Sequence, residues 1–208
     1  MRLFLASCVA GLAAASLFGA EPSAYSLNGP SWAGAQMSYL VNSANLDLAG
    51  LPADTAVRAG ADVWLQQSGV FRFNYAGSSS QTTNTYDGVN LVLFRNASSG
   101  SAIATTYWWT SGSRIVDADV VFWDAAFTFF AGSSGCSGGF YIEDIAVHEF
   151  GHALGLGHSS SSDATMYPSV SSCNTRNRTL DADDIAGARA LYPLPPPPQP
   201  PTGLRLSS

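Results

Sequence analysis

The chain has 208 residues, a length that suits one globular domain with a sizeable core. Hydrophobic residues make up 46% of it and aromatic residues 12%, which excludes a disordered chain. Fifteen acidic residues outnumber nine basic ones and give a net charge of -6, so we expect no nucleic acid and no anionic membrane surface as partner.

The N-terminus has the layout of a secretory signal peptide. Arg2 precedes an apolar, Ala-rich run over residues 3–18, and Glu21-Pro22 ends it. A membrane-spanning helix is the alternative, but the run is short and no basic cluster follows. We predict a signal peptide over residues 1–20, with its cleavage site left open. The mature protein is then secreted, extracellular and free of the membrane.

The next stretch predicts one helix and then four strands. Leu51-Pro52 opens the helix, apolar residues recur at helical spacing from Val57 to Leu65, and Gly69 is placed to end it. Alternating or continuous apolar runs, with a turn at 111–113 between the last two, predict strands over residues 71–75, 89–94, 103–109 and 115–123.

The C-terminal half predicts two further helices, over about 140–154 and over 180–191. Each has acidic residues near its positively polarised start, such as Glu143 in the first and Asp183 in the second. A helix, then strands, then two helices indicate the α+β class, with helices packed against a twisted sheet. A Pro-rich tail follows over residues 194–208.

Removal of the signal leaves two cysteines, Cys136 and Cys173. In an oxidising compartment an isolated pair commonly forms a disulfide, and a loop of this length is worth about 3–4 kcal/mol in the chain-entropy account. Two unrelated free thiols are the alternative. Thiolate ligation of a metal is disfavoured because the close Cys-x-x-Cys spacing is missing.

All three histidines of the chain, His148, His152 and His158, lie in one eleven-residue window. Random placement gives this spacing roughly once in 7,500 cases, so a chance match is improbable. Residues four apart share a helix face, so His148 and His152 can bind one ion. Gly155 can adopt a positive φ and turn the chain back, which brings His158 in from outside the helix.

Three neutral imidazoles suit Zn²⁺ and leave its fourth position for water, as in catalytic zinc sites. Glu149, next to His148, can take a proton from that water and deliver it to a leaving amine. A structural zinc is the alternative, but such sites normally fill all four positions with protein ligands. The pattern therefore predicts one catalytic zinc ion.

The run from His148 to His158 resembles the H-E-x-x-H-x-x-G-x-x-H signature of the metzincin zinc metalloproteases. Met166 matches the Met-containing turn of that group, and Ser159 together with residues 180–185 is similar to the matrixins, the family of matrix metalloprotease catalytic domains. The resemblance covers roughly residues 30–193. It implies a twisted five-stranded mixed sheet with three helices, and a cleft that holds a peptide extended along an edge strand at residues 102–107.

This resemblance also implies an activity and a domain organisation. Residues 21–193 would form a matrixin-like catalytic domain, and residues 194–208 a tail or linker. The protein would be a secreted, monomeric zinc endopeptidase that hydrolyses peptide bonds of protein substrates through a zinc-bound water activated by Glu149. Asp183 and Asp184 would tie the last helix to the Met turn or to the mature N-terminus; ordinary charge at a helix start is the alternative.

The chain departs from the family pattern in several places. No histidine remains for a second, structural zinc, and the stretch between signal and first helix leaves no room for an inhibitory propeptide. Where the family has Pro-x-Tyr beside the specificity pocket, this chain has Pro168-Ser169-Val170, which leaves the preferred substrate residue open. Calcium also stays open, because Asp117, Asp119 and Asp124 form no recognisable binding loop.

A function of another class is a secreted, zinc-containing binding module with little or no proteolysis. Tyr107-Trp108-Trp109 would then form an aromatic platform for a polysaccharide or a protein. Ordinary strand core with one exposed ring is the plainer interpretation of such a triplet. The presence of Glu149 favours the enzyme, because metal binding alone does not need this carboxylate.

Overall fold

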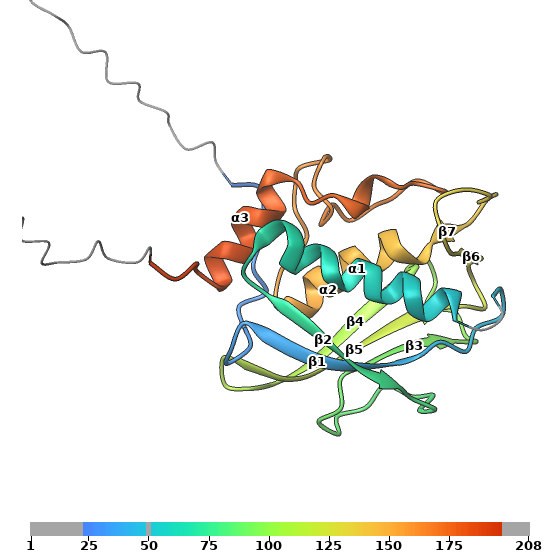
Figure 1. Cartoon of the computed structure of the whole chain (residues 1–208), viewed down its shortest axis with the longest axis horizontal. Helices are drawn as coiled ribbons and strands as arrows, with labels where there is room; N and C mark the ends of the chain where they lie inside the picture. The colour runs from blue at the N-terminus through green and yellow to red at the C-terminus, as the bar shows by residue number, and fades with distance from the viewer. Residues whose placement is uncertain (1–22, 49–50, 197–208) are drawn as a thin grey trace, which may run out of the picture.

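The computed structural model describes residues 23–48 and 51–196, so the predicted signal peptide and most of the predicted tail lie outside the described residues. Three helices and seven strands follow one another along the chain (Figure 1). They are β1 (Gln36–Asn42), α1 (Pro52–Ser68), β2 (Arg72–Ser78), β3 (Leu91–Arg95), β4 (Ala104–Ser111), β5 (Arg114–Trp123), β6 (Phe129–Phe130), β7 (Phe140–Tyr141), α2 (Ile142–Leu154), the 3-10 turn η1 (Arg176–Arg178) and α3 (Ala182–Leu191).

Five of the strands form one mixed sheet in the order β2-β1-β3-β5-β4. The neighbours among β2, β1, β3 and β5 are parallel, and β4 is antiparallel to β5. Helices α1 and α2 cover one face of this sheet (Figure 1). The predicted α+β class, with a five-stranded mixed sheet and three helices, is confirmed. The segment expected at the sheet edge is β4, whose outer side is free to pair.

Most element boundaries agree with the sequence, and two expectations need correction. The predicted order placed a helix first, whereas β1 precedes α1. Its residues Met37, Tyr39 and Val41 are buried at alternate positions, so the period-two pattern of a strand was present in the sequence. The predicted helix over 140–154 begins only at Ile142, because Phe140–Tyr141 pairs with β6. No described helix is long and apolar enough to cross a membrane.

Helix α2 is pressed closely against α1. A Cβ atom added at Gly60 of α1 would lie 2.7 Å from the Cβ of Ala146 and 2.9 Å from the carbonyl oxygen of Glu143. The indole Nε1 of Trp64 donates a hydrogen bond to the carbonyl of Val147 at 2.8 Å. The glycine allows the two backbones to approach, and the indole bond fixes how α2 lies along α1.

The same stripe of α2 also reaches the sheet, because Phe150 lies three and four residues beyond Val147 and Ala146. Phe150 is fully buried, with its ring 5.1 Å from that of Tyr39 on β1 and 4.6 Å from that of Phe73 on β2. Edge-on and tilted contacts at these distances are favourable for aromatic rings. Ten of the thirteen residues of α2 are buried, and the remaining three, Glu143, His148 and His152, are partly exposed.

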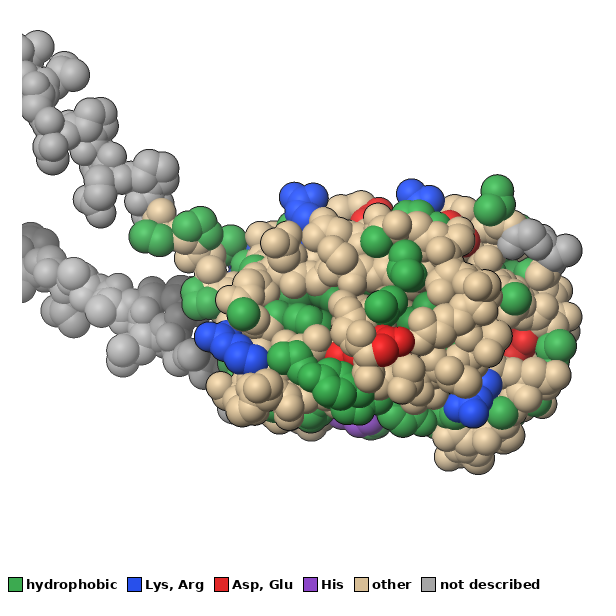
Figure 2. Space-filling model, turned by 90° about the horizontal axis from the view of Figure 1, so that it is seen from below, with side chains coloured by type: hydrophobic (Ala, Val, Ile, Leu, Met, Phe, Trp, Pro, Cys, Tyr) green, Lys and Arg blue, Asp and Glu red, His purple; other side chains and the backbone are tan. Residues whose placement is uncertain are grey.

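A long loop over residues 79–90 lies against the face of the sheet that no helix covers. Asp119 of β5 accepts hydrogen bonds from the backbone N–H groups of Thr85 and Leu91, at 2.9 and 2.8 Å. Asp117 accepts from those of Asp87 and Gly88, at 2.9 and 2.8 Å. Both aspartates are fully buried. Seen from below, the surface of the molecule is mostly polar and carries few charged side chains (Figure 2).

We predict that Gly60→Ala destabilises the protein. Alanine favours a helix by about 1 kcal/mol, but overpacking at a closed contact costs about 1–3 kcal/mol, so we expect a net loss of up to about 2 kcal/mol. Thermal unfolding of the variant measures this loss. Gln66→Ala, on an exposed position of the same helix, is the control and should change stability by less than about 0.5 kcal/mol. A Gly60→Ala protein more stable than wild type would contradict the close approach of α1 and α2.

Candidate metal centre

The three histidines converge at one point of the surface. His148 and His152 lie one turn apart on the outward face of α2, and His158 follows beyond the end of the helix. One ring nitrogen of each lies within 4.8 Å of the others, and the Nε2 atoms of His152 and His158 are 3.2 Å apart. No other group of three or more His, Cys, Asp or Glu among the described residues is arranged to hold a metal ion.

Backbone carbonyls orient two of the rings. Nδ1 of His148 lies 2.7 Å from the carbonyl oxygen of Thr165, and Nδ1 of His152 lies 2.9 Å from that of Leu156. Because a carbonyl only accepts, each Nδ1 carries the proton and Nε2 keeps its lone pair for a metal. Two nitrogens at 2.0–2.1 Å from a tetrahedral ion lie about 3.3 Å apart, close to the separation seen here. The donor set therefore fits Zn²⁺.

The pKa values of the three histidines favour metal binding near neutral pH. Burial lowers the pKa of His148 and that of His152 to about 4. Burial also lowers the pKa of His158, which is more exposed. All three imidazoles are therefore neutral near pH 7, and the neutral ring is the form that binds a metal.

Gly155 reverses the chain between the second and the third histidine. Its φ is 117°, in the region that favours glycine, and its N–H donates to the carbonyl of His152 at 3.0 Å. A Cβ atom here would lie 2.9 Å from the carbonyl oxygen of Pro30. The left-handed conformation of Gly155 ends α2 and directs the chain back toward His158.

The loop that carries His158 is bound along its length by residues 24–28, which we call the N-terminal strap. Asn28 donates its backbone N–H to Gly155 at 3.0 Å and its side-chain amide to the carbonyl of Leu156 at 2.8 Å. The hydroxyl of Ser26 donates to the carbonyl of His158 itself at 2.7 Å. Sequence reasoning missed the strap, because short polar residues in an extended segment carry no periodic signal.

Met166 forms the floor beneath the histidines. It is 1% exposed and packs into a notch at Gly151, where an added Cβ would collide with its sulfur atom. Gly151 lies between His148 and His152 on α2, so the methionine contacts the helix directly behind the two rings. Asp184 of α3 accepts the N–H groups of Thr165 and Met166 at 2.8 and 3.0 Å and holds the turn in place.

Asp183 makes the second connection of α3. It accepts the N–H groups of Ala24 and Tyr25 at 2.8 and 2.9 Å, and the hydroxyl of Ser159 donates to it at 2.7 Å. The implied tie of the last helix is therefore present on both sides. Asp184 holds the Met turn, and Asp183 holds the strap. The mature N-terminus itself lies outside the described residues.

Glu149 is buried on the cleft side of α2, and its Oε2 accepts a hydrogen bond from the hydroxyl of Thr106 at 2.7 Å. Burial raises the pKa of this carboxyl group, against the lowering effects of His152 and of the Thr106 hydroxyl. Thr106 lies on the edge strand β4, to which the sequence assigned substrate binding only. Because side chains alternate along β4, Thr106 points to the same side of the sheet as Trp108, which is the side of the cleft. The strand pattern could therefore have indicated that Thr106 faces the cleft.

An open cavity of about 810 Å³ runs along these residues. Edge strand β4 forms one side, α2 forms the floor, and Tyr167 to Val170 form the other side. Apart from Glu149, its described lining carries no carboxylate and no guanidinium group. In Figure 2 a histidine reaches the surface at the lower edge of the view, beside hydrophobic side chains.

The three aromatic residues of β4 do not share one surface. Trp108 lines the cavity, whereas Tyr107 packs against a small cluster on the other face of the sheet. Trp109 stacks on Tyr86, with ring centroids 6.1 Å apart. Since successive strand residues point to opposite faces, the triplet offers no continuous platform for a polysaccharide.

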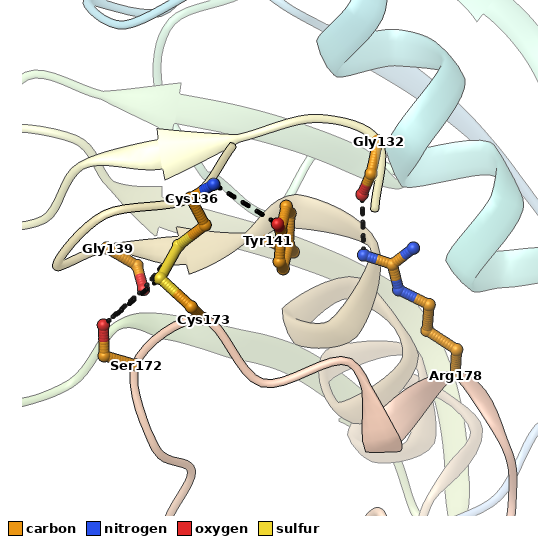
Figure 3. The surroundings of a disulfide bond; sticks show 7 residues. All are labelled: Gly132, Cys136, Gly139, Tyr141, Ser172, Cys173 and Arg178. Carbon is orange, nitrogen blue, oxygen red and sulfur yellow. Dashed lines mark hydrogen bonds between the residues drawn. A yellow bond between two sulfur atoms is a disulfide. The ribbon is translucent and has the colours of Figure 1, made fainter. Parts of the chain in front are cut away.

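The predicted disulfide between Cys136 and Cys173 is present, with the Cα atoms 5.5 Å apart (Figure 3).

The three aspartates considered for calcium are engaged elsewhere. Asp117 and Asp119 hold the loop over 79–90, and Asp124 accepts the N–H of Leu46 at 2.6 Å. They do not gather at one point, and calcium binding stays a prediction.

Comparisons with known proteins agree with this geometry. Metalloendoproteinase 1 of Glycine max is 36% identical over 126 residues, which cover 56% of this chain and 40% of that protein. Neutrophil collagenase of Homo sapiens is 51% identical over 59 residues, 28% of this chain and 13% of that protein. Human matrilysin is 28% identical over 181 residues, 81% of this chain and 61% of that protein. The chain thus spans less than two thirds of the length of these relatives.

The family model of the matrixins matches residues 31–193. This range contains the whole five-stranded sheet, all three helices and the three converging histidines. The N-terminal strap lies before it. The chain therefore belongs to the matrixin family.

Proposed function

We propose that this protein is a secreted zinc-dependent endopeptidase that hydrolyses peptide bonds in protein substrates. One observation carries the proposal. Three neutral imidazoles meet beside a buried carboxylate, at the floor of an open cleft along the edge strand β4, and carbonyls at Nδ1 leave Nε2 of His148 and His152 for a metal. Matrixin membership and the names of the relatives, metalloendoproteinase, collagenase and matrilysin, support the same activity.

His148, His152 and His158 would hold the ion. Bound there, Zn²⁺ supplies a Lewis acid that polarises the scissile carbonyl and makes water more acidic. The free edge of β4 would bind the main chain of an extended peptide. Glu149 would accept a proton from the attacking water and pass it to the nitrogen of the leaving amine. A carboxyl group whose pKa is raised by burial is suited to both halves of this transfer.

Thr106 would act on the reaction through Glu149. Its hydroxyl holds the carboxylate from the strand side of the cleft, at 2.7 Å, and so limits its rotation. Thr106 is therefore proposed as a positioning residue. The alternative of a binding module has less support, because burial of a carboxylate costs free energy and mere adhesion gives no reason for it.

The compartment and the oligomeric state are part of the proposal. A disulfide between Cys136 and Cys173 is typical of proteins that fold in an oxidising compartment, which supports secretion. We expect the protein to act as a monomer, since one chain by itself brings the three histidines and Glu149 together in one cleft.

The central prediction concerns Glu149→Gln. We expect one zinc ion per chain in wild type and in the variant, and a loss of casein hydrolysis by about 10²–10⁴-fold in the variant, because the general base is gone and the ligands are not. A zinc chelator should abolish the wild-type activity. Metal analysis and a fluorescent casein assay measure both. The enzyme hypothesis is wrong if wild type holds zinc but hydrolyses casein no faster than the variant does.

A second prediction concerns Thr106. Thr106→Val keeps the shape of the side chain but removes the donor, and we expect kcat/KM to fall by about 10–150-fold, the equivalent of about 1.5–3 kcal/mol for a bond to a charged group. Thr106→Ser retains the hydroxyl and should stay within about threefold of wild type. Zinc content should be unchanged in both. Equal activity of the Val and Ser variants would show that the hydroxyl has no part in positioning Glu149.

A third prediction concerns pH. His148 and His152 titrate near pH 4 in the metal-free folded protein and near 6.5 when unfolded, so the unfolded chain binds more protons between these values. The stability of the metal-free protein should therefore fall as the pH drops from 6.5 to 4, by about 1.4 kcal/mol per unit of pKa lowering for each histidine, and then level off.

Urea unfolding at several pH values tests this sign. His148→Asn/His152→Asn is the matched control, since an asparagine amide can donate to the same carbonyls but does not titrate. The difference in unfolding free energy between wild type and the control isolates the two histidines from all carboxyl groups. A difference that does not change between pH 6.5 and 4 would refute the expected lowering of their pKa.

A further inference from the structure

One side of the cleft is a segment without regular secondary structure. Residues 167–173, which we call the cleft wall, follow the Met turn directly, and the first four of them line the cavity. Pro168, Ser169, Ser171 and Ser172 are exposed, and Val170 alone among the wall residues packs in part against the main core. Segments with so few buried apolar contacts open at low free energy.

Packing does not support the cleft wall from behind either. A second cavity of about 270 Å³ lies on its far side and shares Tyr167, Ser169, Val170 and Asn177 with the cleft. The wall is therefore a thin partition between two hollow spaces. Its position must come from the points at which the chain is attached.

The beginning of the wall is attached through Asp184, which holds the N–H groups of the Met turn. The far end is attached by the disulfide. Cys173 is linked to Cys136, its N–H donates to the carbonyl of Gly139 at 2.9 Å, and the hydroxyl of Ser172 donates to the same carbonyl at 3.1 Å (Figure 3). All three contacts lead to the segment between β6 and β7.

That segment continues into the opposite side of the cleft. Phe140, the residue after Gly139, lines the same cavity as Val170. Gly139 is buried and closely packed, since an added Cβ would collide with the carbonyl oxygen of Thr128 and the ring of Phe130, and the N–H of Phe140 donates to the carbonyl of Thr128 at 2.9 Å. The disulfide and the two hydrogen bonds to Gly139 thus attach a wall with few apolar contacts to the segment that carries Phe140.

The backbone at Cys173 has a conformation that residues with a side chain seldom adopt. Its φ is 57°, and it is the one non-glycine residue with a positive φ in the part of the chain that the structure describes. A residue with a Cβ disfavours this conformation. Without the covalent bond, the chain would relax here and the end of the wall would move.

We propose that the Cys136–Cys173 disulfide is a specificity-determining element of the cleft, because it sets the distance between the cleft wall and Phe140. The space between them is lined by Phe127, Phe140, Ile145 and Val170, so it receives an apolar substrate side chain of limited size. The inference rests on the proposed peptidase function. It assigns the choice among substrates to a bond that lies outside the catalytic residues.

The test uses the full chain with Cys136→Ser/Cys173→Ser. Four fluorogenic peptides differ only in the residue after the scissile bond, which is Ala, Leu, Phe or Trp. We expect the ratio of kcat/KM between the best and the worst peptide to fall by at least about fivefold, mainly through a higher KM for the best one. Ser172→Ala, which loses only one hydrogen bond of the attachment, should lower the ratio by about twofold. Zinc content should stay at one per chain in both.

Phe71→Leu is the matched control for general destabilisation. Phe71 is fully buried between Phe73 and Tyr192 and does not line the cleft. This variant should melt at a lower temperature, and its ratio between peptides should equal that of wild type. If the disulfide only stabilises the fold, its removal should likewise change kcat/KM for all four peptides by the same factor and leave their ratio unchanged.

Binding of two peptide hydroxamates, with isobutyl and methyl side chains, separates this proposal from the peptidase function. If wild type cleaves none of the peptides but the ratio of the two Kd values narrows in the double variant, the peptidase function fails and the role of the disulfide stands. A folded double variant with the wild-type ratio overturns the role of the disulfide. A double variant that does not fold also overturns it if Ser172→Ala keeps the wild-type ratio, since the bond would then serve folding alone.

Discussion

The burial of helix α2 around most of its circumference is the constraint on which the metal centre depends. Gly60 lets α1 approach α2 closely, and the ring of Phe150 is enclosed by aromatic residues of the sheet. A helix packed around most of its circumference cannot rotate, so His148 and His152 are held toward the cleft. Gly151 of the same helix has no side chain, and Met166 packs against it. The geometry of the two rings is therefore a consequence of core packing.

The sequence predicted those parts whose signal lies in a short window. The three histidines with Gly155 and Met166, both ends of α1 and the disulfide pair were all readable, because spacing and turn residues determine them locally. Strand β1 was missed although Met37, Tyr39 and Val41 occupy alternate positions and all face the core. Leu40, between two of these residues, is also apolar and blurs the alternation, and the pairing partners of β1 lie far away along the chain.

Other features could not be predicted because they arise from contacts between distant segments. The hydrogen bond from Thr106 to Glu149 joins residues 43 positions apart, and no motif marks it. The loop over 79–90 is held by two buried aspartates of β5, where the sequence offered these residues only as a calcium hypothesis. A carboxylate that accepts backbone N–H groups looks the same in sequence as one that awaits a cation.

The N-terminal strap changes what counts as the domain. The family match begins at residue 31, but Ala24, Ser26 and Asn28 are already bonded to the loop of the third histidine. A recombinant fragment cut at the edge of the match would keep every residue of the zinc signature. It would nevertheless release His158 on one side, since Ser26 would no longer hold its carbonyl and Asp183 would lose its bonds to Ala24 and Tyr25. The choice of the first residue in an expression vector is thus also a choice about the geometry of the metal site.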